Sequence, residues 1–223
     1  MRKKLFFQAI SKLIAGIVLI GFLIFLPAGT LRYWNAWLLI ATLFLPMSLI
    51  GILLLWKKPE LLKKRLEWKE KQAEQKQVVL LSSIQFLLGF ISAGISFRCD
   101  WFMVPPPVSL AAAAVFLLGY LMYAEVLREN SYLSRIVEVQ DHQIVIDTGL
   151  YGIIRHPMYA ATLLLFLSMP LILGSLLSFL IFLPYPFLIA KRIRNEEQVL
   201  SAQLAGYIAY QSKVRYRLIP FVW

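Results

Sequence analysis

Four long apolar runs decide what this chain of 223 residues can fold into. An α-helix needs about 20 largely apolar residues to cross the hydrocarbon core of a bilayer. Each run reaches that length, and 60% of all residues are hydrophobic, which is more than soluble domains usually contain. The runs are Leu5 to Ala28, Tyr33 to Trp56, Val78 to Phe97 and Val108 to Leu127. We therefore predict an all-α integral membrane protein.

A fifth apolar region, from Met158 to Ala190, is too long for one upright transmembrane helix. Pro170 and Gly174 lie near its middle, and both residue types interrupt helices. We predict two helices joined by a tight turn around residues 173–175. The chain then has about six transmembrane helices, namely four plus a C-terminal helical hairpin.

The positive charges predict how these helices are oriented, because short cytoplasmic loops carry an excess of Lys and Arg. Nearly all Lys and Arg residues lie at the N-terminus, in residues 57–77 and 128–155, and in the C-terminal tail. We therefore place both termini in the cytoplasm, with the protein in an inner, plasma or endoplasmic reticulum membrane. Three parts follow: an N-terminal transmembrane hairpin (1–56), a basic cytoplasmic loop (57–77) and a membrane core with a cytoplasmic pocket (78–223).

The net charge of +11 does not indicate a nucleic-acid partner. The Lys and Arg residues lie between apolar runs and not along one amphipathic face, so they report membrane topology. The single cysteine, Cys99, excludes an intramolecular disulfide and a Cys/His zinc site. We expect membrane lipids as partners, and neither nucleic acid nor a metal.

Two connecting segments differ in pattern. Residues 57–77 mix Lys and Arg with Glu at spacings of three and four, which favours a solvated interfacial helix over a specific partner site. The apolar residues between Glu129 and Thr148 have no helical period. We predict an extended or irregular stretch there, packed on the ends of the helices.

Two polar clusters flank the predicted hairpin, Gly149 to Tyr159 before it and Arg192 to Leu200 after it. If the hairpin folds back on itself, the clusters meet at one cytoplasmic mouth. Pro157 suits the first turn of a helix, whose free amides can point at an anion. Glu196 and Glu197 suit a cationic or hydroxyl-bearing ligand. The residue types alone also fit an ordinary helix start and a stop-transfer flank.

The order of these motifs resembles one family. It reads G-x-Y-x-x-x-R-H-P-x-Y, an apolar hairpin, R-x-x-x-E-E-x-x-L and then G-Y-x-x-Y. This order resembles the isoprenylcysteine carboxyl methyltransferase family and its phospholipid-methylating relatives, from Asn130 to about Arg217. The resemblance implies an S-adenosylmethionine-dependent methyltransferase, with the cofactor in a cytoplasm-facing pocket and a lipidic acceptor that enters from the bilayer.

The resemblance also implies the site residues. Arg192 matches the arginine that the family places at the acceptor, and it is the catalytic candidate. The expected cofactor contacts are Tyr151, His156, Pro157, Met158, Tyr159 and Glu196, with an upstream lining of Glu138, Gln143, Ile144, Val145 and Ile146. The chain departs from the family pattern at Gln143, where histidine is frequent, and at Ala161, where glycine is common. Both replacements keep a hydrogen-bonding or a small side chain, so we expect cofactor binding to survive.

The acceptor chemistry stays open at this point. A carboxylate acceptor is ionised at neutral pH and needs no base, and Arg192 can orient it through paired hydrogen bonds. An amine acceptor must lose a proton, which makes Glu196, Glu197 or His156 candidate bases. Two further alternatives are an NADPH-dependent lipid or sterol reductase of related fold and a non-catalytic membrane protein that uses the pocket for binding or scaffolding.

Overall fold

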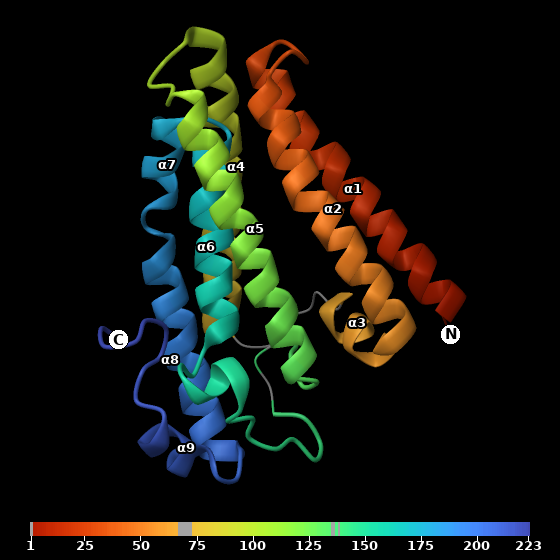
Figure 1. The fold of residues 1–223 in the computed structure, drawn as a ribbon, viewed down its shortest axis with the longest axis vertical. Helices are drawn as coiled ribbons and strands as arrows, with labels where there is room; N and C mark the ends of the chain where they lie inside the picture. Colours follow the sequence, from red (N-terminus) through yellow and green to blue (C-terminus); the bar gives the residue numbers. More distant parts are fainter. Residues whose placement is uncertain (1, 67–72, 135–136, 138) are drawn as a thin grey trace.

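The computed structural model of the protein describes residues 2–66, 73–134, 137 and 139–223 (Figure 1). Over these residues the regular elements are helices. In chain order they are α1 (Arg2–Ala28), α2 (Trp34–Lys57), α3 (Pro59–Leu66), α4 (Ala73–Cys99), α5 (Pro106–Glu129), the 3-10 helix η1 (Gly149–Gly152), α6 (Pro157–Ile172), α7 (Leu176–Phe182), α8 (Tyr185–Gln203) and α9 (Tyr207–Lys213).

Within the described residues, five helical stretches are long and apolar enough to cross a membrane. They are α1, α2, Gln75–Cys99 of α4, α5 and the run Leu176–Gln203, which comprises α7 and α8. Helix α6 is apolar but has only 16 residues. The predicted class, an all-α integral membrane protein, is confirmed, and each of the four predicted spans coincides with a helix that differs from it by a few residues at its ends.

The turn of the C-terminal hairpin lies where the sequence predicts it. Helix α6 ends at Ile172, and Gly174 follows with φ of 73°. Glycine adopts this left-handed conformation without the steric cost that a Cβ brings. Ser175 then caps α7, because its hydroxyl accepts a hydrogen bond from the Ser178 amide at 3.1 Å. Chain reversal is therefore encoded in three consecutive residues.

Close helix contacts hold the hairpin against the earlier helices, and Figure 1 shows α6 between α5 and α7. Helix α5 packs along α6, where a Cβ on Gly119 would lie 3.1 Å from Leu165. Helix α4 packs against α7, where a Cβ on Gly89 would lie 2.2 Å from the Phe182 ring. A larger residue at either glycine would push these helices apart. The hairpin is thus fixed from two sides.

Helix α3 turns part of the basic loop toward the protein. Leu61 is 3% exposed and packs with Val126 and Leu127 of α5. Arg65 donates to the Ser134 carbonyl at 3.2 Å and to the Tyr123 hydroxyl at 2.5 Å. The expected interfacial helix therefore exists over Pro59–Leu66, but one of its sides is buried against α5 and the segment after it. The charges of residues 67–72 that entered this prediction lie outside the described residues.

The described residues between Asn130 and Asp147 contain turns and no regular element, as the sequence predicts. Tyr132 and Asn130 form a local turn, in which the Asn130 side chain accepts from the Tyr132 amide at 2.9 Å. The Lys64 ammonium donates to the Gln140 side chain and ties this segment to α3. The segment lies over the ends of α5 and α6 and forms one wall of the site described next (Figure 1).

Candidate cofactor cavity

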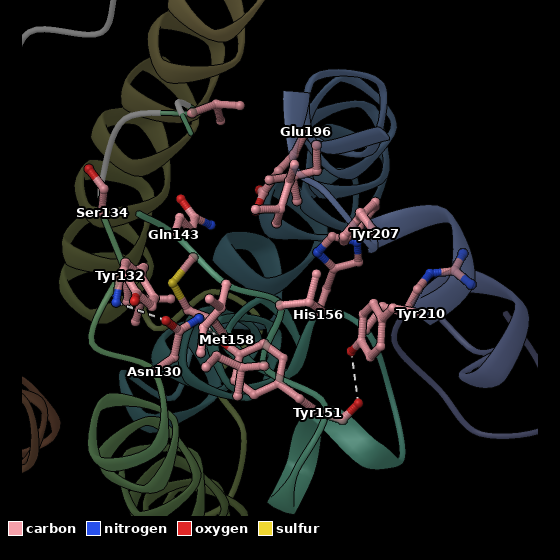
Figure 2. A pocket seen from close by; sticks show the side chains of 18 of the residues that line it. Asn130, Tyr132, Ser134, Gln143, Tyr151, His156, Met158, Glu196, Tyr207 and Tyr210 are labelled. Atoms are coloured by element: carbon pink, nitrogen blue, oxygen red, sulfur yellow. Dashed lines mark hydrogen bonds between the residues drawn. The ribbon is translucent and has the colours of Figure 1, made fainter. Parts of the chain in front are cut away.

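A cavity lies at the N-terminal end of α6, and Figure 2 shows it from close by. Its empty space is about 840 Å³, a volume that includes the open solvent at its mouth. Its walls come from the irregular segment, η1, α6, α8 and α9. The lining residues are Asn130, Tyr132, Leu133, Ser134, Val137, Gln143, Ile144, Val145, Ile146, Tyr151, Arg155, His156, Met158, Tyr159, Arg192, Glu196, Leu200, Leu204, Tyr207 and Tyr210.

The cavity brings together nearly all residues that the sequence motif singled out. The predicted cofactor residues that line it are Gln143, Ile144, Val145, Ile146, Tyr151, His156, Met158, Tyr159 and Glu196, and the predicted acceptor residue Arg192 lines it too. Pro157 is fully buried in the first turn of α6 and is not part of the lining. Glu138 lies outside the described residues. Segments far apart in sequence therefore meet here, as the folded-back hairpin requires.

The C-terminal segment fixes the start of α6. The Arg155 amide donates to the Tyr216 carbonyl and the His156 amide donates to the Arg217 carbonyl, both at 2.9 Å. Pro157 is the first residue of α6, where its missing N–H leaves no hydrogen bond unmade. These contacts set the direction in which His156 and Met158 enter the cavity.

Glu197 is the centre of a closed group of charges, which we call the Glu197 cluster: Arg155, His156, Glu197 and Arg217. Its carboxylate accepts from Arg155 Nε at 2.7 Å and from Arg217 Nε at 2.8 Å, and His156 Nε2 lies 3.1 Å away. Glu197 and Arg155 are almost fully buried. Buried charges persist when they are paired and hydrogen-bonded, so this cluster joins α6, α8 and the C-terminal segment.

The Arg155 side chain is directed into the protein. The Arg155 guanidinium also donates to the Val214 and Arg215 carbonyls, at 2.8 and 3.1 Å. Its hydrogen bonds therefore point inward, to the Glu197 carboxylate and to backbone carbonyls of the C-terminal segment. The sequence offered one signal, since Arg155 and Glu197 are oppositely charged residues of the two motifs that the hairpin brings together.

A second group, which we call the Glu196 cluster, consists of Tyr159, Arg192 and Glu196 and faces the cavity. The Tyr159 hydroxyl donates to the Glu196 carboxylate and accepts from Arg192 Nε at 2.9 Å. Arg192 and Glu196 are four residues apart on α8, so they project from the same side of the helix. An anion-binding and a cation-binding group thus stand next to each other at one end of the cavity.

Helix α4 braces this part of α8. Gln75 is fully buried, and its amide donates to the Asn195 side chain at 2.6 Å and to the Arg192 carbonyl at 3.4 Å. These bonds hold the helix turn that carries Arg192, so α4 contributes to the site without lining it.

The opposite wall is held by tyrosines. Asn130 donates to the Tyr151 hydroxyl at 3.0 Å, and the Tyr210 hydroxyl donates to the Tyr151 carbonyl at 2.8 Å. Burial raises the pKa of both phenols, so both stay protonated at neutral pH. Gln143, which stands where the related family often has histidine, accepts from the Gln140 amide at 2.9 Å. The side-chain oxygen of Gln143 therefore stabilises the turn between residues 140 and 143.

Several lining residues were not assigned a role from the sequence. Tyr207 and Tyr210 belong to the G-Y-x-x-Y motif, but nothing in their spacing says that α9 closes the cavity. Residues of the irregular segment, such as Asn130 and Ser134, have no periodic signal at all. Among the described residues, no group of three His, Cys, Asp or Glu side chains is placed to hold a metal ion.

The bundle of apolar helices defines the class of the protein, a multi-pass membrane protein, and a polar cavity lies at one end of the bundle. Residues 110–202 match the model of the isoprenylcysteine carboxyl methyltransferase (ICMT) family. This part of the chain reaches from α5 into α8 and contains the segments Gly149 to Tyr159 and Arg192 to Leu200, and it is similar to that family of membrane methyltransferases. The match confirms the resemblance that the motifs showed. A search of curated proteins gives no significant match.

Proposed function

We propose that the protein binds S-adenosylmethionine in this cavity and methylates the carboxylate of a lipidic acceptor, such as an isoprenylcysteine-like compound or another lipid acid. The observation that carries the proposal is the cavity itself. It unites Tyr151, His156, Met158, Tyr159 and Glu196 with Arg192 inside a region that is similar to a methyltransferase family.

The cavity residues suit this cofactor in their chemistry. S-adenosylmethionine supplies a methyl group on a positively charged sulfur, together with an ammonium, a carboxylate and a flat base. The Glu196 carboxylate and the ring of Tyr159 provide a negative surface for a cation. The apolar side chains of Val145 and Leu204 leave room for a base.

Arg192 supports an anionic acceptor. Its guanidinium lies at the cavity wall, held by the Tyr159 hydroxyl at 2.9 Å, and a guanidinium binds carboxylates through paired hydrogen bonds. The transfer is then an in-line displacement, in which the protein aligns the carboxylate and keeps water away. A carboxylate is already deprotonated, so this reaction asks for no general base.

The Glu197 cluster weakens the amine alternative. An amine acceptor needs a base, and Glu197 and His156 are two of the three candidates. Both are buried and bound to each other, and Glu197 also accepts from Arg155 and Arg217. A carboxylate so stabilised by cations is a poor proton acceptor. Of the three candidates, Glu196 alone remains in a position to serve an amine.

We also propose that the cavity opens to the cytoplasm and that lipid enters it from the bilayer. The basic loop with α3 lies at the cavity end of the protein, and cytoplasmic loops carry the excess of positive charge. Both chain ends lie toward this end in Figure 1, in agreement with cytoplasmic termini. The helices α4, α6 and α8 lead from the apolar region to Arg192 and Tyr159.

The first experiment is a calorimetric titration of detergent-purified protein with S-adenosylhomocysteine, with NADPH as the comparison. Micromolar binding of S-adenosylhomocysteine alone supports the proposal. Binding of NADPH alone contradicts it and favours a reductase, and binding of neither leaves a scaffold role. The acceptor is then tested with methyl-labelled S-adenosylmethionine and vesicles that contain an S-farnesylcysteine derivative or phosphatidylethanolamine. Label that alkali releases as methanol shows an ester, whereas alkali-stable label shows N-methylation.

A further inference from the structure

One polar group of the cavity is buried without a partner. The side chain of Tyr207 is 4% exposed, and its hydroxyl makes no hydrogen bond in the part of the chain that the structure describes. Most buried hydroxyls find a partner, because leaving one unsatisfied destabilises the folded protein. Such a group at the wall of a cavity therefore indicates a bond that forms when the cavity is filled.

The backbone holds Tyr207 in this place. Gly206 has φ of 83°, a conformation that glycine adopts readily, and α9 starts at the next residue. The ring of Tyr207 packs with Leu204 and Tyr210, with Val145 and Leu200 at its border. Figure 2 shows Tyr207 and Tyr210 on the side of the cavity that α9 forms. Packing of the Tyr207 ring therefore fixes the position of its hydroxyl.

The hydroxyl of Tyr210, in the same motif, is hydrogen-bonded and gives a comparison for the Tyr207 hydroxyl. It donates to the Tyr151 carbonyl at 2.8 Å and so joins α9 to η1. The two tyrosine rings lie 5.7 Å apart and both line the cavity. The Tyr210 hydroxyl stabilises the fold, whereas the Tyr207 hydroxyl has no partner among the described residues.

We propose that the Tyr207 hydroxyl donates a hydrogen bond to the nucleoside half of the bound cofactor. This inference rests on the proposed function and deepens it. Burial and the nearby charges of Glu197 and Glu196 raise the pKa of Tyr207, so the hydroxyl keeps its proton and can donate to a ring nitrogen or a ribose oxygen.

The distribution of polarity along the cavity assigns the nucleoside half to Tyr207. The part of the cavity that Arg192 lines carries a guanidinium, which suits the amino-acid half and the acceptor. The side with Tyr207 is bordered by apolar Leu200, Leu204 and Val145. A flat base gains from apolar and aromatic walls with a few placed hydrogen bonds. Tyr207 supplies both the wall and the bond.

The test is the affinity of Tyr207→Phe for S-adenosylhomocysteine and for 5′-methylthioadenosine, which keeps the nucleoside half and lacks the amino-acid half. Loss of one hydrogen bond weakens binding by about tenfold, and both ligands should lose the same factor. Tyr216→Phe is the matched control, because it removes a phenol oxygen near the same end but outside the cavity lining. Its affinities should equal those of the unmodified protein.

Thermal unfolding without ligand separates binding from folding. Tyr207→Phe removes an unsatisfied hydroxyl, so its midpoint should stay or rise. Tyr210→Phe removes a satisfied one, so its midpoint should fall. Unchanged affinity of Tyr207→Phe for both ligands overturns the inference, as does a loss confined to S-adenosylhomocysteine, which would place the hydroxyl at the amino-acid half. An unmodified protein that binds no S-adenosylhomocysteine contradicts the proposed function itself.

Discussion

The Glu196 and Glu197 clusters come from neighbouring residues of α8, yet they differ in what completes them. Around Glu197 every observed contact runs to another part of the chain, to Arg155, His156 and Arg217, and the carboxylate is 5% exposed. Glu196 accepts from the Tyr159 hydroxyl at the wall of the cavity, and the same hydroxyl accepts from Arg192. A one-residue step along the helix turns the next side chain by about 100°. One carboxylate thus faces the protein and the other faces the cavity.

This difference shows that adjacent acidic residues in one motif can have separate roles. The Glu197 cluster, which we call closed, joins α6, α8 and the C-terminal segment and so builds the cavity. The Glu196 cluster, which we call open, places polar groups at the cavity wall, where a ligand can contact them. Exchanging each glutamate for the glutamine of the same shape should therefore damage folding in one case and binding in the other.

The largest expected effect follows from Glu197→Gln. The change leaves Arg155 buried without its counter-charge, and breaking a buried ion pair on one side costs about 3–5 kcal/mol. We expect a strongly lowered unfolding midpoint in detergent, measured by thermal denaturation without ligand. Glu196→Gln is the matched control, with a midpoint close to that of the unmodified protein. Equal midpoints for the two variants would falsify the distinction between the clusters.

The second effect concerns the acceptor side of the open cluster. Arg192→Ala removes the guanidinium that we propose for the acceptor carboxylate, so turnover should fall about a hundredfold. The affinity for S-adenosylhomocysteine, measured by calorimetry, should change far less. Arg194→Ala on the exposed side of the same helix is the control and should retain turnover. A parallel loss of turnover and affinity would instead place Arg192 at the cofactor.

The sequence predicted the architecture where the pattern was local. The apolar runs, the turn at Gly174 and the helix start at Pro157 depend on residues close in the chain, and the structure has all three. The meeting of the two motifs followed from folding the hairpin back on itself. The sequence did not predict that α8 continues to Gln203, which sets Arg192, Glu196 and Leu200 in one row along the cavity.

What escaped sequence reasoning depends on long-range contacts. The bond from Arg217 to Glu197 joins residues from two segments without any periodic relation. The packing of Leu61 against Val126 and Leu127 turns α3 inward, although its charges are typical of a solvated surface helix. The wall formed by Tyr207 depends on how α9 folds back after Gly206. In each case the partner is chosen by tertiary structure and not by local propensity.

The third effect concerns the affinity of the Glu196 cluster for the cofactor. Glu196→Gln removes the negative charge next to the cavity, and we expect the affinity for S-adenosylhomocysteine to fall about tenfold, which is the weight of one charge-assisted contact. Calorimetry measures this change, and the midpoint in the absence of ligand should stay nearly constant. A destabilised variant with unchanged affinity would mean that Glu196 also belongs to the framework of the fold.

The smallest effect is expected at an ion pair that belongs to neither cluster. Lys213 Nζ lies 2.6 Å from the Asp147 carboxylate, and both side chains are exposed to solvent. The ammonium lowers the pKa of Asp147, so any stability that the pair adds is present above the usual carboxyl range and is lost as the pH falls through the lowered pKa. Water and salt screen such a pair, and its contribution is small. Asp147→Asn should therefore leave the unfolding midpoint at neutral pH and the affinity for S-adenosylhomocysteine within experimental error. A clear loss of affinity in this variant would show that α9 is positioned by its surface charges, and the contrast between closed and open clusters would then have to include the loop that ends at Asp147.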